Sequence, residues 1–198
     1  MVDLLAERSV IVSRETVRLW INRFGRHFAD SIRTDRPKPN DKWHMDEAVI
    51  TIGGKKFWLW RAIDTAGDVL DILVQARRHT KAAKRFFSRL VKQFGEPRVV
   101  VTDQLRSYAA AKREVAPGLD HWSHKGLNNR TENSHLPFRK REKTMQGFRS
   151  ASGLQRFISV HSATRNDFFV PARRRYAQTI RYHRMVAIDA WKTASGIA

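Results

Sequence analysis

Runs of apolar residues separated by short polar segments predict a sheet in the first half of the chain. The ranges 43–52, 56–64 and 69–75 are rich in β-branched and aromatic residues, and the segments between them contain glycine. This spacing is typical of strands joined by tight turns in an antiparallel meander. A fourth strand is expected at 98–102, because a short run dominated by valine is typical of a strand covered on both faces.

Helices are predicted where apolar residues recur at every third or fourth position. The clearest helix begins at Thr80, where an apolar stripe alternates with a basic face until Gly95 and Pro97 end the pattern. Further helices are expected at 104–112 and 154–163. The order of these elements predicts an α/β protein in which helices pack on a mixed sheet.

Residues 13–25 predict an N-terminal helix, with Ser13 as its N-cap and Gly25 at its end. Its apolar and polar positions fall on opposite sides, which suits the helix of a helix-turn-helix that reads the major groove. A surface helix with a solvated basic face is the alternative, and only the overall charge favours the DNA-reading interpretation. The side chains expected to contact DNA there are Arg14, Arg18 and Asn22.

Composition divides the chain into four parts. Residues 30–41 contain two prolines and almost no apolar residues, as in a linker. We therefore expect a partial helix-turn-helix segment at 1–29, a main domain at 42–170 and a basic tail at 171–198 in which no core is recognisable. The tail contains consecutive arginines that are candidates for DNA binding: Arg173, Arg174 and Arg175.

The charge of the chain narrows the class of partner. There are 38 Lys and Arg residues against 19 Asp and Glu residues, which gives a formal net charge of +19. So basic a protein is expected to bind a polyanion. Nucleic acid is favoured over a membrane surface, because no apolar run approaches the roughly 20 residues that a bilayer crossing needs. Cysteine is absent, which excludes disulfides and thiolate metal sites and fits a cytoplasmic protein.

Three acidic residues stand where packing does not explain them. Asp46 lies inside an otherwise apolar strand, where an unpaired carboxylate would be costly unless a cation meets it. Asp103 directly follows the fourth strand, at the end where α/β sheets place their sites. Glu132 lies in a polar segment further along the chain. Together these acids predict a divalent-metal site for phosphodiester chemistry.

Each of these acids also has a less specific explanation. Asp103 could be the N-cap of the helix that follows it, and Glu132 could be a solvated helix residue. Glu47 could replace Asp46 as the ligand, because adjacent residues of a strand point to opposite faces of the sheet. Several histidines could support the metal or contact DNA, although a polar surface role is the plainer explanation: His44, His121, His124 and His135.

The element order is that of a ribonuclease H-like sheet of five strands flanked by helices. In that arrangement the acids come from the first strand, the end of the fourth strand and a later helix. Three carboxylates would hold two Mg²⁺ ions about 3.5–4 Å apart, one activating the attacking oxygen and the other stabilising the leaving oxygen. Mn²⁺ is expected to substitute for Mg²⁺.

Four motifs then occur in a characteristic order along the chain. They are Trp43–Glu47, Phe57–Asp64, Thr102–Tyr108 and His124–His135. Together they resemble the insertion sequence six family of bacterial transposases, and the resemblance extends from about Leu4 to Phe169. It implies a DDE transposase whose catalytic and metal-binding acids are Asp46, Asp103 and Glu132.

The resemblance also implies partners. Arg139, seven residues after Glu132, falls where such enzymes place a basic residue that contacts DNA, and Lys140 beside it is a further candidate. The implied substrate is double-stranded DNA, both the terminal inverted repeats of a mobile element and the target. A homo-oligomer on DNA, without a membrane partner, is expected in the bacterial cytoplasm, associated with the nucleoid.

Departures from the family pattern change some expectations. Gln104 stands where relatives often carry a basic residue, so one phosphate contact is expected to be missing. Pro137 lies in the helix that should carry Glu132 and Arg139, and a proline there is expected to kink or end the helix. The chain begins inside what should be the first helix of the helix-turn-helix. Four apolar side chains are therefore expected to stay partly exposed: Val17, Trp20, Ile21 and Phe24.

Two other functions compete with a transposase. One is a decayed copy that binds DNA without turnover. The other is a ribonuclease or resolvase on the same fold, which would be expected to lack the helix-turn-helix segment. A strand-transfer measurement with and without a divalent metal separates these possibilities.

Overall fold

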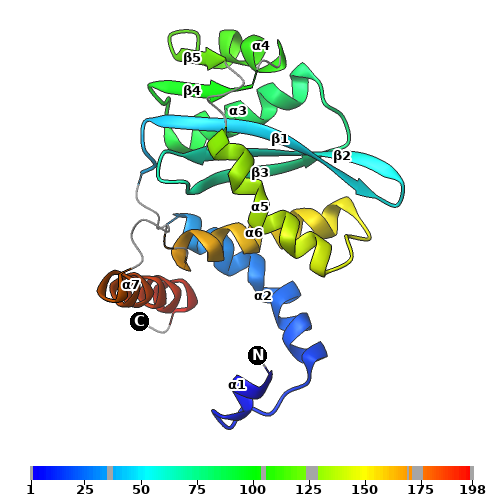
Figure 1. Cartoon of the computed structure of the whole chain (residues 1–198), viewed down its shortest axis with the longest axis vertical. Coiled ribbons are helices and arrows are strands. Elements are labelled where there is room, and N and C mark those ends of the chain that lie inside the picture. The colour runs from blue at the N-terminus through cyan, green and yellow to red at the C-terminus, as the bar shows by residue number, and fades with distance from the viewer. Residues whose placement is uncertain are drawn as a thin grey trace. The chain divides into compact units, whose positions relative to one another are not determined.

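The computed structural model describes residues 2–34, 38–103, 106–123, 129–168, 170 and 176–196, without the side chains of residues 2, 4, 106, 129, 130 and 132. The chain forms two compact units (Figure 1). One unit is Pro37–Ile158, and the other combines Met1–Arg36 with Ser159–Ala198. Among the described residues, no helix combines the length and the apolar character needed to cross a membrane.

The larger unit is built on a five-stranded sheet in the order β3-β2-β1-β4-β5. Strands β1, β2 and β3 form an antiparallel meander, whereas β4 pairs parallel to β1 and β5 pairs parallel to β4. This mixed sheet confirms the predicted fold class. The strands are β1 (Lys42–Ile52), β2 (Lys55–Asp64), β3 (Val69–Gln75), β4 (Val99–Thr102) and β5 (Asp120–Ser123).

Helices cover both faces of this sheet (Figure 1). One face packs on α3 (Thr80–Phe94) and α4 (Arg106–Val115), and the other packs on α5 (Asn129–Thr144) and α6 (Ala151–Phe168). Each face of the sheet has its own hydrophobic core, and successive side chains of β1 point alternately to one core and the other. Trp43 and Met45 lie in the core with α3, while Ile50 and Ile52 lie in the core with α5 and α6.

The ends of α3 are fixed by local contacts. The Nδ1 atom of His79 accepts a hydrogen bond from the backbone N–H of Ala82, which caps the first turn. At the other end Gly95 adopts a positive φ of 81°, which glycine tolerates without steric cost. The helix therefore begins and ends where its sequence pattern predicts.

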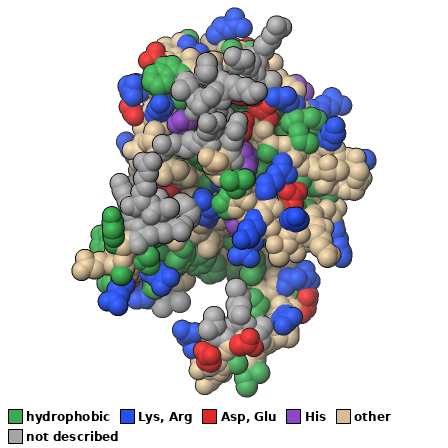
Figure 2. Space-filling model, viewed as in Figure 1, with side chains coloured by type: hydrophobic (Ala, Val, Ile, Leu, Met, Phe, Trp, Pro, Cys, Tyr) green, Lys and Arg blue, Asp and Glu red, His purple; other side chains and the backbone are tan. Residues whose placement is uncertain are grey.

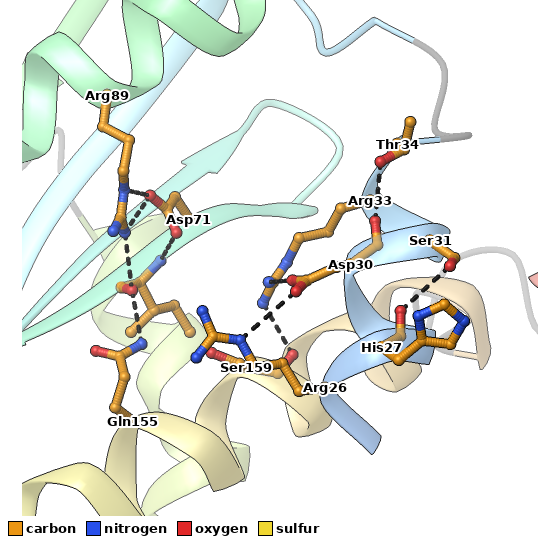
Figure 3. Close-up of polar contacts among 11 residues, drawn as sticks. Arg26, His27, Asp30, Ser31, Arg33, Thr34, Asp71, Arg89, Gln155 and Ser159 are labelled. Carbon is orange, nitrogen blue, oxygen red and sulfur yellow. Dashed lines mark hydrogen bonds and ion pairs between the residues drawn. The ribbon is translucent and has the colours of Figure 1, made fainter. Parts of the chain in front are cut away.

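The outer edge of β3 is bound by side chains rather than by another strand (Figure 3). The Oε1 atom of Gln155 accepts a hydrogen bond from the Val74 N–H at 2.8 Å, and its Nε2 atom donates to the Ile72 carbonyl at 3.1 Å. Arg89 of α3 also donates to the Ile72 carbonyl and pairs with Asp71. The Gln155 amide therefore links α6 to the sheet.

We expect Gln155→Ala to lower the free energy of unfolding by about 1–3 kcal/mol, because the half-buried Val74 N–H loses its partner and the Ile72 carbonyl loses one of its two donors. Urea unfolding measures the change. Gln93→Ala, on the exposed side of α3, is the matched control and should stay within about 0.5 kcal/mol of the parent. An equal response of the two variants would show that the Gln155 amide contributes nothing specific.

The smaller unit corrects the predicted end of the N-terminal helix. It contains α1 (Val2–Ala6), and α2 runs over Arg14–Thr34, well past Gly25. A Cβ atom at Gly25 would lie 3.2 Å from a methyl group of Val160 in α6, so glycine here permits close helix packing instead of ending the helix. The predicted linker at 30–41 is correspondingly too long, because Asp30 still lies in α2 and pairs there with Arg26 and Arg33 (Figure 3).

The C-terminal segment is also more ordered than predicted. In place of a basic tail without a core, residues Ala177–Ser195 form helix α7. Ala194 is buried in a small core with Ala29, Ile32 and Ala163, and Trp191 packs against it. The sequence did not reveal this core because small alanine side chains build most of it, and alanine leaves only a weak hydrophobic periodicity.

The apolar side of α2 is only partly covered. Trp20, Ile21 and Phe24 each expose between 42% and 49% of their surface, as expected from the sequence, whereas Val17 is half-buried. The Ser13 hydroxyl accepts a hydrogen bond from the Thr16 N–H at 3.1 Å, as predicted for an N-cap. The DNA-reading role of this helix stays a prediction.

Candidate active site

The pairing of β1 with β4 brings two of the predicted acids to the same level of the sheet. Met45 lies beside Thr102 in this parallel pair, so Asp46 and Asp103 are the next residues on neighbouring strands. Oxygen atoms of Asp46, Glu47 and Asp103, one from each carboxylate, lie within 4.8 Å of one another. Asp46 is 14% exposed and Asp103 is 33% exposed at the side chain. The cluster is therefore open enough at Asp103 for a ligand to approach.

Asp46 and Glu47 lie on opposite faces of the sheet, as adjacent strand residues must. Asp46 is on the face covered by α5, where His135 approaches it. Glu47 is on the other face, where the Tyr108 hydroxyl donates a hydrogen bond to it at 3.0 Å and Arg78 forms an ion pair with it. With its two oxygens in these contacts and its side chain 3% exposed, Glu47 is a weaker candidate for a ligand than Asp46.

The surroundings of Glu47 favour its neutral form. Burial and, after it, the Asp103 carboxylate raise the pKa of Glu47 to about 7, against the lowering influence of Arg78 and Tyr108. Burial also raises the pKa of Tyr108 well above its ordinary value, so its hydroxyl stays a hydrogen-bond donor. Glu47 therefore adds less than a full negative charge beside Asp46 and Asp103.

Arg78 is a site residue that the sequence analysis missed. It belongs to the loop between β3 and α3, and its guanidinium pairs with Glu47 and lies 3.7 Å from an Asp103 oxygen. Strand β3 runs in the same direction as β1 and β4. The loop after β3 therefore lies at the carboxyl ends of these strands, as Asp103 does. The available signal was a pair of consecutive arginines, Arg77 and Arg78, one residue after the end of a predicted strand.

We expect Arg78→Gln to lower the free energy of unfolding by about 1–3 kcal/mol, because it leaves the buried Glu47 carboxylate without its cation. Adding Glu47→Gln should recover part of the loss, since the unpaired acid is then gone. Thermal or urea unfolding in EDTA measures both variants. Arg77→Gln is the matched control, because Arg77 is the exposed neighbour of the same loop; equal effects at 77 and 78 would contradict the assignment.

Glu132 lies in α5, the helix that crosses the Asp46 face of the sheet, but its side chain is outside the described residues. The next turn of α5 carries His135, whose Nε2 atom lies 3.6 Å from an Asp46 oxygen. Burial lowers the pKa of His135, which favours the neutral imidazole. Helix α5 therefore brings a buried histidine to Asp46, whereas the sequence favoured an exposed position for His135.

Helix α5 continues through Pro137 and does not end there, which was one of the two expected effects of the proline. The residue after the proline anchors the helix: Phe138 is fully buried, and its ring stacks on Phe148 with an interplanar angle of 15°. This packing compensates for the backbone hydrogen bond that proline cannot donate. One continuous helix therefore carries both Glu132 and Arg139.

The basic residues predicted to bind DNA fall into different settings. Arg139 donates to the Val49 carbonyl of β1 and to Glu142 at 3.0 Å, which ties α5 to the sheet, while Lys140 is exposed. On α2, Arg14 and Asn22 are exposed and Arg18 pairs with Glu15. Figure 2 shows Lys and Arg side chains scattered over the visible face. Three further candidates lie outside the described residues: Arg173, Arg174 and Arg175.

The other histidines contact protein groups where the structure describes them. The Nε2 atom of His121 lies 2.8 Å from the Thr102 hydroxyl, and burial lowers the pKa of His121. His44 is buried in β1. His124 and the two residues between Asp103 and α4, Gln104 and Leu105, lie outside the described residues, so the predicted N-cap role of Asp103 is not tested.

Comparison with known proteins shows the family to which the chain belongs. A family model described as a DDE domain matches residues 40–182. The chain belongs to the DDE transposase family. The transposase for insertion sequence-like element IS431mec of Staphylococcus aureus is 34% identical over 154 residues, which cover 75% of this chain and 69% of that protein. The transposase for insertion sequence element IS257 in transposon Tn4003 of the same species has the same identity and coverage.

Solved structures support the fold of this DDE transposase. The magnesium complex of the HTLV-2 integrase catalytic core domain, in its trimeric form, aligns with a TM-score of 0.50 at 18% identity, covering 68% of this chain and 90% of that domain. The simian T-cell lymphotropic virus intasome gives the same TM-score at 14% identity and half of its chain covered. These structures confirm the predicted integrase-type core, and the family model with the Staphylococcus aureus relatives confirms the resemblance to the insertion sequence six family.

Proposed function

We propose that this DDE transposase binds the ends of its insertion sequence and catalyses metal-dependent cleavage and transfer of DNA strands. The observation that carries the proposal is the meeting of Asp46 and Asp103 at one level of the β1/β4 pair, in a chain of this family. The same two acids stand in the positions that the family motifs assign to the first two catalytic carboxylates.

The donors of this cluster suit Mg²⁺. Carboxylate oxygens are the ligands that this hard cation prefers, and those of Asp46 and Asp103 lie close enough to share ions. Glu132 would complete the set from α5. When bound, Mg²⁺ supplies Lewis-acid activation of the attacking oxygen and stabilisation of the leaving oxygen.

The surrounding residues prepare the cluster for an anionic substrate. Arg78 compensates the charge of Glu47 and lies beside Asp103, so the acids present less negative charge to a phosphate. His135 lies against Asp46 in its neutral form and limits the orientations open to that carboxylate. The Lys and Arg side chains on the surface attract the DNA phosphates, because the chain carries a formal net charge of +19.

The proposed partners are duplex DNA at the terminal inverted repeats, target DNA and further copies of the chain. Recognition of the repeats is assigned to α2, through Arg14, Arg18 and Asn22, on an exposed and basic side of the helix. Arg139 and Lys140 are assigned to DNA near the acids. With its apolar side only partly covered, α2 is expected to bind the terminal repeat with little preference over scrambled DNA.

A strand-transfer assay tests this function. The chain, a pre-cut end of the insertion sequence and a supercoiled plasmid should yield joined products with Mg²⁺ or Mn²⁺, and none with EDTA. A protein that binds the end but gives no product with either metal is a non-catalytic DNA-binding copy. Cleavage of RNA·DNA hybrids without joining would instead indicate a ribonuclease.

Footprinting tests the recognition step separately. We expect weak and diffuse protection of the terminal repeat. Trp20, Ile21 and Phe24 are only partly buried, so their packing fixes the position of α2 weakly. Scrambled duplex of equal length is the control. Strong protection confined to the terminal repeat would show that α2 reads sequence well as it stands.

A further inference from the structure

An exposed tryptophan lies on the same face of the sheet as Asp46. Trp122 of β5 pairs with Val101 of β4, and Val101 pairs with His44 of β1. Side chains at one level of paired strands point to the same face, and His44 and Asp46 share a face because they are two residues apart. Trp122 is 41% exposed there. An aromatic ring therefore stands open to solvent on the face that carries the first acid.

A lysine completes this feature. The Lys42 ammonium lies over the Trp122 ring, 4.2 Å from the ring centroid. Lys42 begins β1 and also shares the Asp46 face, because it is four residues from Asp46. Strand β4 separates β1 from β5, so the Lys42 side chain reaches across β4. An exposed aromatic ring and a cation thus occur together, the combination with which proteins bind single-stranded nucleic acid.

The position of Trp122 is fixed relative to Asp103 by the residues on either side of it. The His121 ring contacts the Thr102 hydroxyl at 2.8 Å, and the Ser123 hydroxyl donates to the Asp103 carbonyl at 3.0 Å. Strand spacing of about 4.8 Å and a rise of about 3.3 Å per residue place Trp122 about 8 Å from Asp103 along the sheet, and about 12 Å from Asp46. At the duplex rise of about 3.4 Å per nucleotide, these spans correspond to about two to four nucleotides of a DNA strand.

We propose that Trp122 and Lys42 form a subsite for an unpaired nucleotide that lies about two to four nucleotides from the reacting phosphate. The base stacks on the Trp122 ring, and the Lys42 ammonium moves from the ring to the phosphate of that nucleotide. The base must be unpaired, because bases inside a duplex already stack on both neighbours. The subsite rests on the proposed function, since it gives the DNA strand a position beside the acids, and it assigns a contact that no family motif contains.

Binding to ends of different structure tests the subsite. The chain is titrated in EDTA, where strand transfer cannot occur, with a terminal-repeat duplex that is either blunt or carries three unpaired nucleotides, with 2-aminopurine among them. We expect Trp122→Ala to weaken binding of the unpaired end by about tenfold to a hundredfold and to remove the change in 2-aminopurine fluorescence. Binding of the blunt end should change by less than about twofold.

Matched variants separate stacking from general effects. Trp122→Phe retains an aromatic face and should keep most of the affinity for the unpaired end. Lys42→Ala should lower the log-log salt slope for that end by about 0.7, the value for one phosphate of a single strand. Trp20→Ala removes a tryptophan of equal exposure from α2 and should leave the ratio between the two ends unchanged. Circular dichroism establishes that each variant is folded.

The outcomes distinguish this inference from the proposed function. Equal weakening of both ends by Trp122→Ala, or no weakening of either, would overturn the subsite even in a chain that transfers strands. A selective loss at the unpaired end supports the subsite even if the metal-dependent assay yields no product. A response of the two ends to Trp20→Ala as large as that to Trp122→Ala would also overturn it.

Discussion

Asp46→Asn, Asp103→Asn and Glu132→Gln are each expected to lower strand transfer by about a thousandfold or more. Each substitution keeps the shape of the side chain and removes one negative charge from the group that would hold the metal. A metal contributes several kcal/mol of charge stabilisation, and each 1.4 kcal/mol, roughly, is a factor of ten in rate. The measurement is the yield of joined product from a pre-cut end with Mg²⁺.

Binding and folding should survive these substitutions. The DNA affinity of each variant in EDTA is expected to match or slightly exceed that of the parent, because a negative charge near the phosphates is removed. Asp41→Asn, an exposed acid just before β1, is the matched control and should retain full activity. Near-normal transfer by one of the three variants would remove that residue from the site, and Glu47→Gln would then be the next variant to measure.

DNA affinity is expected to fall about a thousandfold between 50 and 200 mM salt, if the chain contacts about six phosphates. Each contact releases condensed counterions and contributes roughly −0.9 to the log-log slope on duplex DNA. The formal charge of +19 is the reason to expect so steep a dependence. Fluorescence anisotropy with a labelled terminal repeat over a salt series gives the slope.

Charge reversal identifies the residues that make DNA affinity depend on salt. Replacing Arg173, Arg174 and Arg175 with Glu should flatten the slope by about 0.9 for each phosphate that the chain no longer neutralises. Reversal of three exposed cations on α3 is the control and should change the slope less: Lys81, Arg85 and Lys92. If affinity is insensitive to salt, counterion release is not the main source of binding. The C-terminal arginines would then be tested as a contact for another protein subunit.

The sheet could be predicted because its strands carry strong, separate signals. The meander has long apolar runs with glycine turns. Strand β4 is a short run dominated by valine, so Asp103, the residue after it, was correctly predicted to lie at the strand end. Strand β5 could not be located, because only four residues pair with β4 and they include an aspartate, a histidine and a serine. Pairing to one neighbour, rather than side-chain burial, creates that strand.

The site was less predictable because its contacts depend on tertiary structure. To choose between Asp46 and Glu47, one must know which helices cover each face of β1. The sequence does not contain this information. Arg78 and Tyr108 meet Glu47 from a loop and from α4, and neither has a role that the family motifs assign. Likewise α2 extends past Gly25 because Val160 packs there, a contact far away in the chain.

The hydrogen bonds of Gln155 to β3 have a consequence for how copies of this chain can associate. An exposed strand edge offers unpaired N–H and carbonyl groups to which a second molecule can add a strand. On β3 the Val74 N–H and the Ile72 carbonyl are already occupied, and the Arg89 guanidinium adds a charge at the same place. A strand from another copy would have to displace these groups first. Multimers formed on DNA are therefore expected to use side-chain surfaces, and the occupied edge of β3 opposes aggregation by strand addition.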